Sequence, residues 1–173
     1  MTIADPVRPT LFPERVYLRF VRLASYLQPA VLLFLRVTWG WQFFETGRAK
    51  LMDVPLFIDH FEKWGVPAPG INVYLAACTE CFGGIFLYIG FGGRLISVPL
   101  LFTMFVAYCT AHIQDTKVIF SDPDRVLNDA PFPFLCAALV ILAFGPGPLS
   151  IDGLLKWLFY RNSAQKSLLS DLP

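Results

Sequence analysis

The chain has 173 residues, of which 55% are hydrophobic, 16% are aromatic and 16% are charged, and its formal net charge is +1. Because a soluble domain carries about 25% charged residues, the 14 Lys+Arg and 13 Asp+Glu are too few to cover a soluble globule of this size. Disorder is excluded because disordered chains are poor in apolar residues. The near-neutral charge and the lack of a dense basic stripe exclude a nucleic-acid partner.

Residues 1–28 are predicted to form a basic amphipathic arm. Apolar side chains recur there at helical spacing, at Val16, Phe20, Leu23 and Leu27. Arginines line another face, at Arg15, Arg19 and Arg22. This pattern favours an interfacial helix over residues 11–27 that lies on anionic cytoplasmic lipid. An ordinary solvated arm is the alternative interpretation.

Four long apolar stretches follow, and together they predict an all-α membrane protein. A bilayer core about 30 Å thick needs roughly 20 residues of helix. Only helices and closed barrels satisfy the backbone in lipid, and the stretches do not alternate as barrel strands do. We therefore expect a four-transmembrane-helix bundle within residues 29–155, followed by a cytoplasmic tail over residues 156–173. The expected spans are residues 29–50, 71–91, 95–112 and 129–146.

The connections between the spans predict which parts lie outside the lipid. Phe57, His60, Phe61 and Trp64 form an apolar stripe that indicates a short extracytoplasmic surface helix ending at Gly65. Residues 114–128 form the longest polar segment and are expected to be an extracytoplasmic loop. The side that carries both termini has eight basic residues, and the opposite side has five. The positive-inside rule therefore places both termini in the cytoplasm.

Arg36 and Glu80 are the two ionisable residues predicted deep within spans. At 1.5 Å per residue, Arg36 lies roughly 10 Å from the cytoplasmic end of the first span, and Glu80 lies about 14 Å from the outer end of the second. In a core about 30 Å thick these depths differ by only about 6 Å. We therefore expect an Arg36–Glu80 ion pair. It either fixes helix register or forms part of a small-molecule or proton site.

Helical spacing places small residues beside these charges. Gly40, Gly47 and Lys50 share a face with Arg36, and Gly84 shares a face with Glu80. Small residues on those faces allow close helix contact, and Gly83 is expected to be a further packing residue. Glu45 lies about 180° from Arg36 and is expected to pair with Arg48. At the outer end of the bundle we expect Lys50, His112, Gln114, Asn128 and Asp129 to converge.

The four cysteines, Cys78, Cys81, Cys109 and Cys136, include one C-x-x-C spacing around Glu80. In a membrane helix, Cys78 and Cys81 are interpreted as packing residues because a low-dielectric setting makes a thiol inert. The sequence does not decide whether any of the four cysteines form a disulfide between spans. His60, His112 and the scattered aspartates have no ligand spacing, so no metal site is predicted. Nucleotide, flavin and haem motifs are absent from the sequence.

These motifs, in this order, resemble the DoxX family of small four-span bacterial membrane proteins. The resemblance covers about residues 30–155 and rests on motifs in the first three spans and after the fourth, and the motif of the third span is Met104-x-x-Ala107. The first span has Arg36, Gly40, Gly47, Lys50 and Leu51, similar to the family's R-x3-G…G-x-x-K-L. The second has Glu80, Gly83, Gly84 and Gly90, similar to E-x-x-G-G…G. After the fourth come Gly145, Gly147, Ser150 and Asp152, similar to GPG-x-x-S-x-D.

The resemblance implies a multi-pass protein of the bacterial inner membrane that is linked to redox metabolism, and the family includes a relative of the small subunit of thiosulfate:quinone oxidoreductase. One hypothesis is a subunit of a quinone-linked oxidoreductase that binds quinone at a polar core of Arg36, Lys50, Glu80, His112 and Asp129. The main alternative is a non-catalytic assembly or anchor subunit with a protein partner in the lipid bilayer. A small-molecule permease has less support, because no inverted repeat is detectable. Whether the chain is an enzyme by itself stays open.

Overall fold

The computed structural model describes residues 12–117 and 120–170, and the side chains within these ranges except at residues 12–15, 115 and 162–170. Residues 1–11 of the predicted arm and the side chain of Arg15 therefore lie outside what is described. All regular elements in the described ranges are helices, which confirms the all-α class. They are α1 (Phe12–Met52), α2 (Val54–Lys63), α3 (Pro69–Ile89), α4 (Gly93–Cys109), α5 (Ile113–Lys117), α6 (Pro123–Asn128), α7 (Pro131–Phe144) and α8 (Ile151–Ser170).

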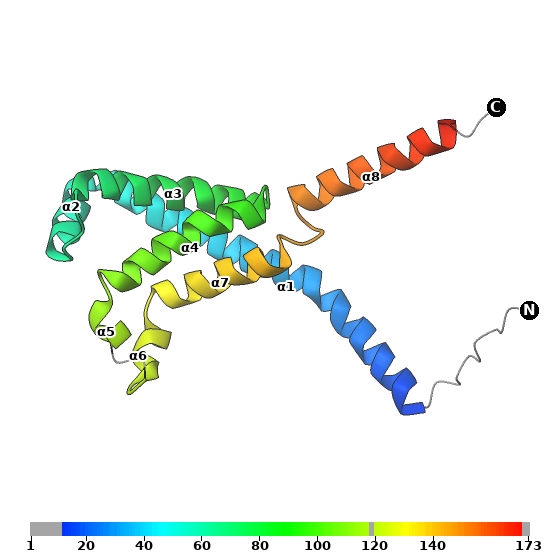
Figure 1. The fold of residues 1–173 in the computed structure, drawn as a ribbon, viewed down its shortest axis with the longest axis horizontal. Coiled ribbons are helices and arrows are strands. Elements are labelled where there is room, and N and C mark those ends of the chain that lie inside the picture. The colour runs from blue at the N-terminus through cyan, green and yellow to red at the C-terminus, as the bar shows by residue number, and fades with distance from the viewer. Residues whose placement is uncertain (1–11, 118–119, 171–173) are drawn as a thin grey trace, which may run out of the picture.

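Four helices form a bundle in which each contacts two neighbours. α1 packs mainly against α3 and α4 against α7, while contacts between α3 and α4 and between α1 and α7 complete the ring (Figure 1). Phe43, Leu87, Leu100, Met104 and Ile141 form the buried centre. Phe134 adds an edge-to-face contact to Phe43, with ring centroids 4.7 Å apart. The core is therefore apolar and aromatic, and the charged residues lie toward its ends.

Glycines set the distance between α1 and α3. A Cβ at Gly40 would lie 2.7 Å from the backbone nitrogen of Tyr88, and one at Gly47 would lie 2.7 Å from the carbonyl oxygen of Ala77. A Cβ at Gly84 would lie 2.7 Å from the carbonyl oxygen of Gly40. The predicted packing role of these three glycines is thus supported by the backbone geometry. Gly83 instead faces the side chain of Leu100 on α4.

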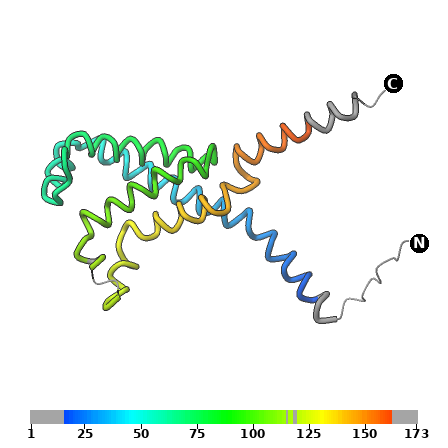
Figure 2. The backbone as a smooth tube through the Cα atoms, viewed as in Figure 1, coloured from blue at the N-terminus to red at the C-terminus, as the bar shows by residue number. Residues whose placement is uncertain are grey.

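The arm does not form a separate helix. α1 runs through Pro29 without interruption and has 41 residues, which corresponds to roughly 60 Å of helix. Its first half leaves the bundle at an angle to the second half (Figure 2). Pro29 lacks a backbone N–H, which favours a bend. The predicted amphipathic segment is helical, but it continues into the first apolar helix.

The two ends of the bundle differ. α2, α5 and α6 lie at one end, and the arm half of α1 and the helix α8 extend from the other (Figure 1). The surface helix predicted around residues 57–64 is present as α2, capped by the side chain of Asp53. The predicted polar loop instead contains the short helices α5 and α6. The predicted tail belongs mainly to α8.

Two described helices are long and apolar enough to cross a membrane, over Val16–Met52 and Pro69–Ile89. α4 and α7 are apolar but have 17 and 14 residues, or about 25 and 21 Å of helix. Four crossings therefore remain a prediction. Large apolar side chains are exposed around the bundle, including Trp41, Phe82, Leu95 and Phe102. An apolar exterior of this kind suits a lipid environment.

Candidate functional site

Arg36 does not pair with Glu80, so this prediction is wrong. The Arg36 side chain is 3% exposed. Its guanidinium donates hydrogen bonds to the carbonyl oxygens of Pro146 (3.0 Å) and Leu149 (2.6 Å). Both carbonyls belong to the connection between α7 and α8. Arg36 thus ties this connection to α1, while its buried Nε has no hydrogen-bond partner among the described residues.

Side-chain direction explains the error. A helical side chain tilts toward the N-terminus of its own helix. Arg36 on α1 therefore extends toward the end of the bundle where α7 meets α8. Glu80 lies on the antiparallel α3, so its side chain extends toward the opposite end. The depth of the two Cα atoms allowed a pair, but their side chains point apart.

Lys50 is the partner of Glu80. The Lys50 ammonium forms an ion pair with the Glu80 carboxylate, and the two side chains are 17% and 3% exposed. Lys50 extends back into the bundle while Glu80 extends toward it, as the same tilt requires. The Lys50 nitrogen also lies 5.8 Å from the ring centroid of Phe57 on α2. This pair joins α1 to α3 near the α2 end.

The connection between α7 and α8 is a compact turn built by its glycines. Gly145 and Gly147 have φ angles of +82° and +83°, a left-handed region that side chains disfavour. The Ser150 hydroxyl donates to the Gly147 carbonyl and accepts from the Gly153 amide. The residues quoted for the C-terminal motif therefore hold one turn in the shape that presents its carbonyls to Arg36.

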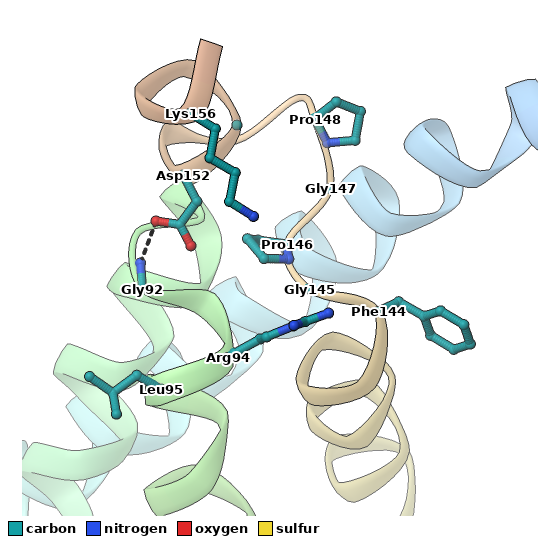
Figure 3. A pocket seen from close by; sticks show the side chains of 11 residues that line it. Gly92, Arg94, Leu95, Phe144, Gly145, Pro146, Gly147, Pro148, Asp152 and Lys156 are labelled. Atoms are coloured by element: carbon teal, nitrogen blue, oxygen red, sulfur yellow. Dashed lines mark hydrogen bonds between the residues drawn. The ribbon is translucent and has the colours of Figure 1, made fainter. Parts of the chain in front are cut away.

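Asp152 connects this turn to the start of α4. Its carboxylate accepts a hydrogen bond from the backbone N–H group of Gly92 (2.8 Å, Figure 3). The other carboxylate oxygen accepts a hydrogen bond from the backbone N–H group of Gly93 (3.1 Å). Its own backbone N–H donates to the Gly90 carbonyl (3.1 Å). A carboxylate at a helix N-terminus satisfies amides that have no partner in the helix. Arg36 and Asp152 thus join all four bundle helices to α8.

A second polar group lies at the α2 end. His112 Nδ1 is 3.0 Å from a carboxylate oxygen of Asp129, and the Tyr108 hydroxyl donates to the Val126 carbonyl. The other Asp129 oxygen is buried without a hydrogen bond among the described residues. His112 and Asp129 meet as expected, but no described hydrogen bond or ion pair links them to Lys50. Gln114 and Asn128 are exposed.

The remaining predictions have mixed outcomes. Glu45 pairs with Arg48 at 2.8 Å, as predicted. All four cysteines are free thiols in the described structure. Within residues 12–117 and 120–170, no three His, Cys, Asp or Glu side chains gather where they could hold a metal ion. Tyr108 was missed, although its i, i+4 spacing from His112 was a usable signal. The roles of Arg94 and Lys156 were also missed, since both counted only among the eight basic residues of the side that carries the termini.

Comparison with known protein families finds a match over part of the chain. The model of the DoxX family matches residues 31–113. This segment contains α2, α3 and α4 together with the second half of α1, and it includes Arg36, Lys50 and Glu80. The turn between α7 and α8 lies outside it. No curated protein and no solved structure matches the chain.

Proposed function

Because the chain belongs to the membrane-associated DoxX family, we propose that it is an integral membrane subunit that anchors or assembles a larger protein complex. In this proposal α1, α3, α4 and α7 cross the bacterial inner membrane, and both termini lie in the cytoplasm. The described parts of α1 and α8 extend from one end of the bundle, which supports placing both termini on one side (Figure 1). The excess of basic residues on that side supports the cytoplasm.

One contrast carries the anchoring role. The charged side chains of the bundle have partners within the chain, whereas two helical segments, the N-terminal half of α1 and α8, extend from it as arms with exposed apolar faces. Arg36, Glu80 and Asp152 are held by partners within the chain. The arm half of α1 and α8 leave the bundle, and both expose large apolar side chains. Leu23 is 68% exposed and Trp157 is 54% exposed. Apolar helix faces of this kind are typical of surfaces that another protein or a lipid covers.

Native co-purification tests this role. The protein is extracted in a mild detergent, and we expect a stoichiometric partner to remain bound. Leu23→Gln and Leu158→Gln each place a polar amide on one arm and are expected to reduce partner recovery severalfold. Leu56→Gln is the matched control, because Leu56 is exposed on α2 at the opposite end. A monodisperse wild-type protein with no partner would contradict the proposal.

The second candidate is a redox role in which quinone binds beside Lys50 and Glu80. Its support is the incomplete burial of the Lys50 side chain, which is 17% exposed in an apolar, aromatic setting beside Phe57. An ammonium has three N–H donors, so one to Glu80 leaves others for a quinone carbonyl. Glu80 would carry protons. Arg36 is not part of this candidate site, because its guanidinium is bound to the turn after α7.

Bound quinone is measured in lipid extracts of the purified protein, followed by thermal melts with added ubiquinone. Quinone that stabilises the wild type but not Lys50→Met would support the redox role. Arg48→Met is the matched control, since Arg48 is an exposed cation of α1 that pairs with Glu45. The candidate fails if quinone is absent and has no effect on the melts, even if a protein partner is found.

A further inference from the structure

A cleft of about 590 Å³ opens at the end of the bundle from which both arms extend. It lies between the first turn of α4, the end of α7 and the first turns of α8. Its polar lining comes from Arg94, Asp152 and Lys156, and its apolar lining includes Leu95, Phe144 and Pro146. In Figure 3 the side chains of Arg94 and Lys156, from two different helices, both reach into the cleft. None of these residues belongs to the Lys50–Glu80 site.

The cleft has an excess of positive charge. Lys156 has no hydrogen bond or ion pair with any described residue. Arg94 donates to the Ala143 carbonyl at 3.0 Å, which leaves other guanidinium N–H groups unused. The Asp152 carboxylate is already engaged by two backbone N–H groups. The buried Arg36 adds its charge from behind the turn, where it binds the Pro146 carbonyl.

Two large apolar side chains of the lining are also strongly exposed. Leu95 is 80% exposed and Phe144 is 63% exposed, and they lie where α4 begins and α7 ends. If these helices cross the membrane, this end lies at the boundary between headgroups and acyl chains. Cations therefore stand at headgroup level beside apolar side chains at acyl-chain level. A ligand that satisfies both has an anionic head and an apolar tail.

We propose that this cleft binds an anionic phospholipid, with its phosphate between Arg94 and Lys156 and its acyl chains against Leu95 and Phe144. Basic pockets between transmembrane helices on the cytoplasmic side recognise anionic headgroups. Since Arg94 and Lys156 outnumber Asp152 in the lining, a neutral quinone would leave a net positive charge without a counter-charge. The bound lipid would neutralise the net positive charge of the cleft and stabilise the junction of α4, α7 and α8. The lipid proposal rests on the membrane location in the proposed function but not on a protein partner. The lipid proposal and the anchoring role can therefore fail independently of each other.

The test uses the full chain in nanodiscs of phosphatidylcholine to which phosphatidylglycerol is added. We expect phosphatidylglycerol to raise the melting temperature and to be retained as one tightly held lipid in native mass spectrometry. The double variant Arg94→Gln with Lys156→Gln removes both cations of the cleft. We expect it to weaken retention of phosphatidylglycerol roughly tenfold or more. Lys63→Gln with Arg125→Gln is the charge-matched control at the opposite end of the bundle.

Arg94 also holds the end of α7, so the single variant Lys156→Gln guards against misfolding. It should melt like the wild type in phosphatidylcholine alone and should retain less phosphatidylglycerol. Equal retention by wild type and cleft variants would overturn the proposal, as would an equal loss in the Lys63/Arg125 control. If inorganic phosphate stabilises the protein as much as the lipid does, the cleft binds free phosphate and the lipid assignment is wrong.

Discussion

At the scale of single residues, the direction of a charged side chain decides which partner it finds. Arg36 and Lys50 share one face of α1, yet Arg36 reaches the turn after α7 and Lys50 reaches Glu80. The two cations therefore stabilise different parts of the molecule. Arg36 fixes a connection at one end, and Lys50 fixes the α1–α3 contact toward the other.

Double-mutant cycles should separate these two roles. Lys50→Met combined with Glu80→Gln is expected to show a coupling of about 1–3 kcal/mol, because the residues form a partly buried ion pair. Arg36→Met combined with Glu80→Gln should be additive within about 0.5 kcal/mol, because the residues share no partner. The measurement is unfolding by SDS titration from mild-detergent micelles. A large Arg36–Glu80 coupling would restore the pair predicted from depth alone.

Truncation of Glu80 should cost more than its conversion to an amide. Glu80→Ala leaves the Lys50 ammonium without its acceptor, whereas Glu80→Gln keeps an oxygen in place. We expect Glu80→Ala to have the lower melting temperature of the two in thermal melts. Equal melting temperatures would argue that the pair contributes little to stability.

Replacement of Arg36 should loosen the turn between α7 and α8. Arg36→Lys keeps the charge but loses the planar fork that reaches two carbonyls at once. We expect it to cost about 2 kcal/mol, and Arg36→Met to cost at least as much, because hydrogen bonds to a charged donor are lost. Hydrogen exchange should rise at residues 149–153. Arg48→Met, which breaks an exposed pair, should change stability by less than about 0.5 kcal/mol.

At the scale of elements, the contacts of single glycines predict which substitutions disturb the packing of α1 against α3. Gly47→Ala should separate α1 from α3, because its Cβ would clash with the backbone of Ala77 and Cys81. We expect a loss of about 1–3 kcal/mol, as for overpacking in a core. Gly70→Ala is the control, because its nearest neighbour is 4.0 Å away. The same SDS titration measures both variants, and equal losses would contradict the packing role of Gly47.

Helix positions and small-residue faces could be predicted because they depend on local spacing along the chain. The apolar stretches gave α3, α4 and α7 to within a few residues at most ends, and the aromatic stripe gave α2. The end of the arm could not be predicted in this way. Pro29 favours a bend, but a helix can continue through proline, and here α1 does. Periodicity alone does not separate a bent helix from two helices.

The polar sites were harder to predict because they depend on partners that carry no side-chain signal. Arg36 binds backbone carbonyls of Pro146 and Leu149, and Asp152 binds the amides of Gly92 and Gly93. Every residue has such groups, so the sequence does not mark which are used. His112 and Asp129 were found because both flank apolar stretches that end on the same side. The cleft between Arg94 and Lys156 could not be predicted, because it depends on how the turn between α7 and α8 folds against α4.

At the scale of the whole molecule, the number of membrane crossings fixes which surfaces can meet which partners. If only the two long apolar helices cross, Arg125 lies on the same side as Arg161. If α4 and α7 also cross, Arg125 lies with Glu62 on the opposite side. The short α4 and α7 can cross if the bilayer thins locally or flanking charged side chains reach the interface.

Single cysteines placed in a cysteine-free variant distinguish these topologies. Glu62→Cys, Arg125→Cys and Arg161→Cys place one thiol each on α2, α6 and α8, and all three positions are exposed. A membrane-impermeant maleimide added to intact cells is expected to label the Glu62 and Arg125 variants and to spare the Arg161 variant, which reacts only after lysis. This outcome needs both α4 and α7 to cross. Labelling of Arg125 only after lysis would remove these two spans, and with them the premise that Leu95 and Phe144 lie at acyl-chain level in the proposed lipid cleft.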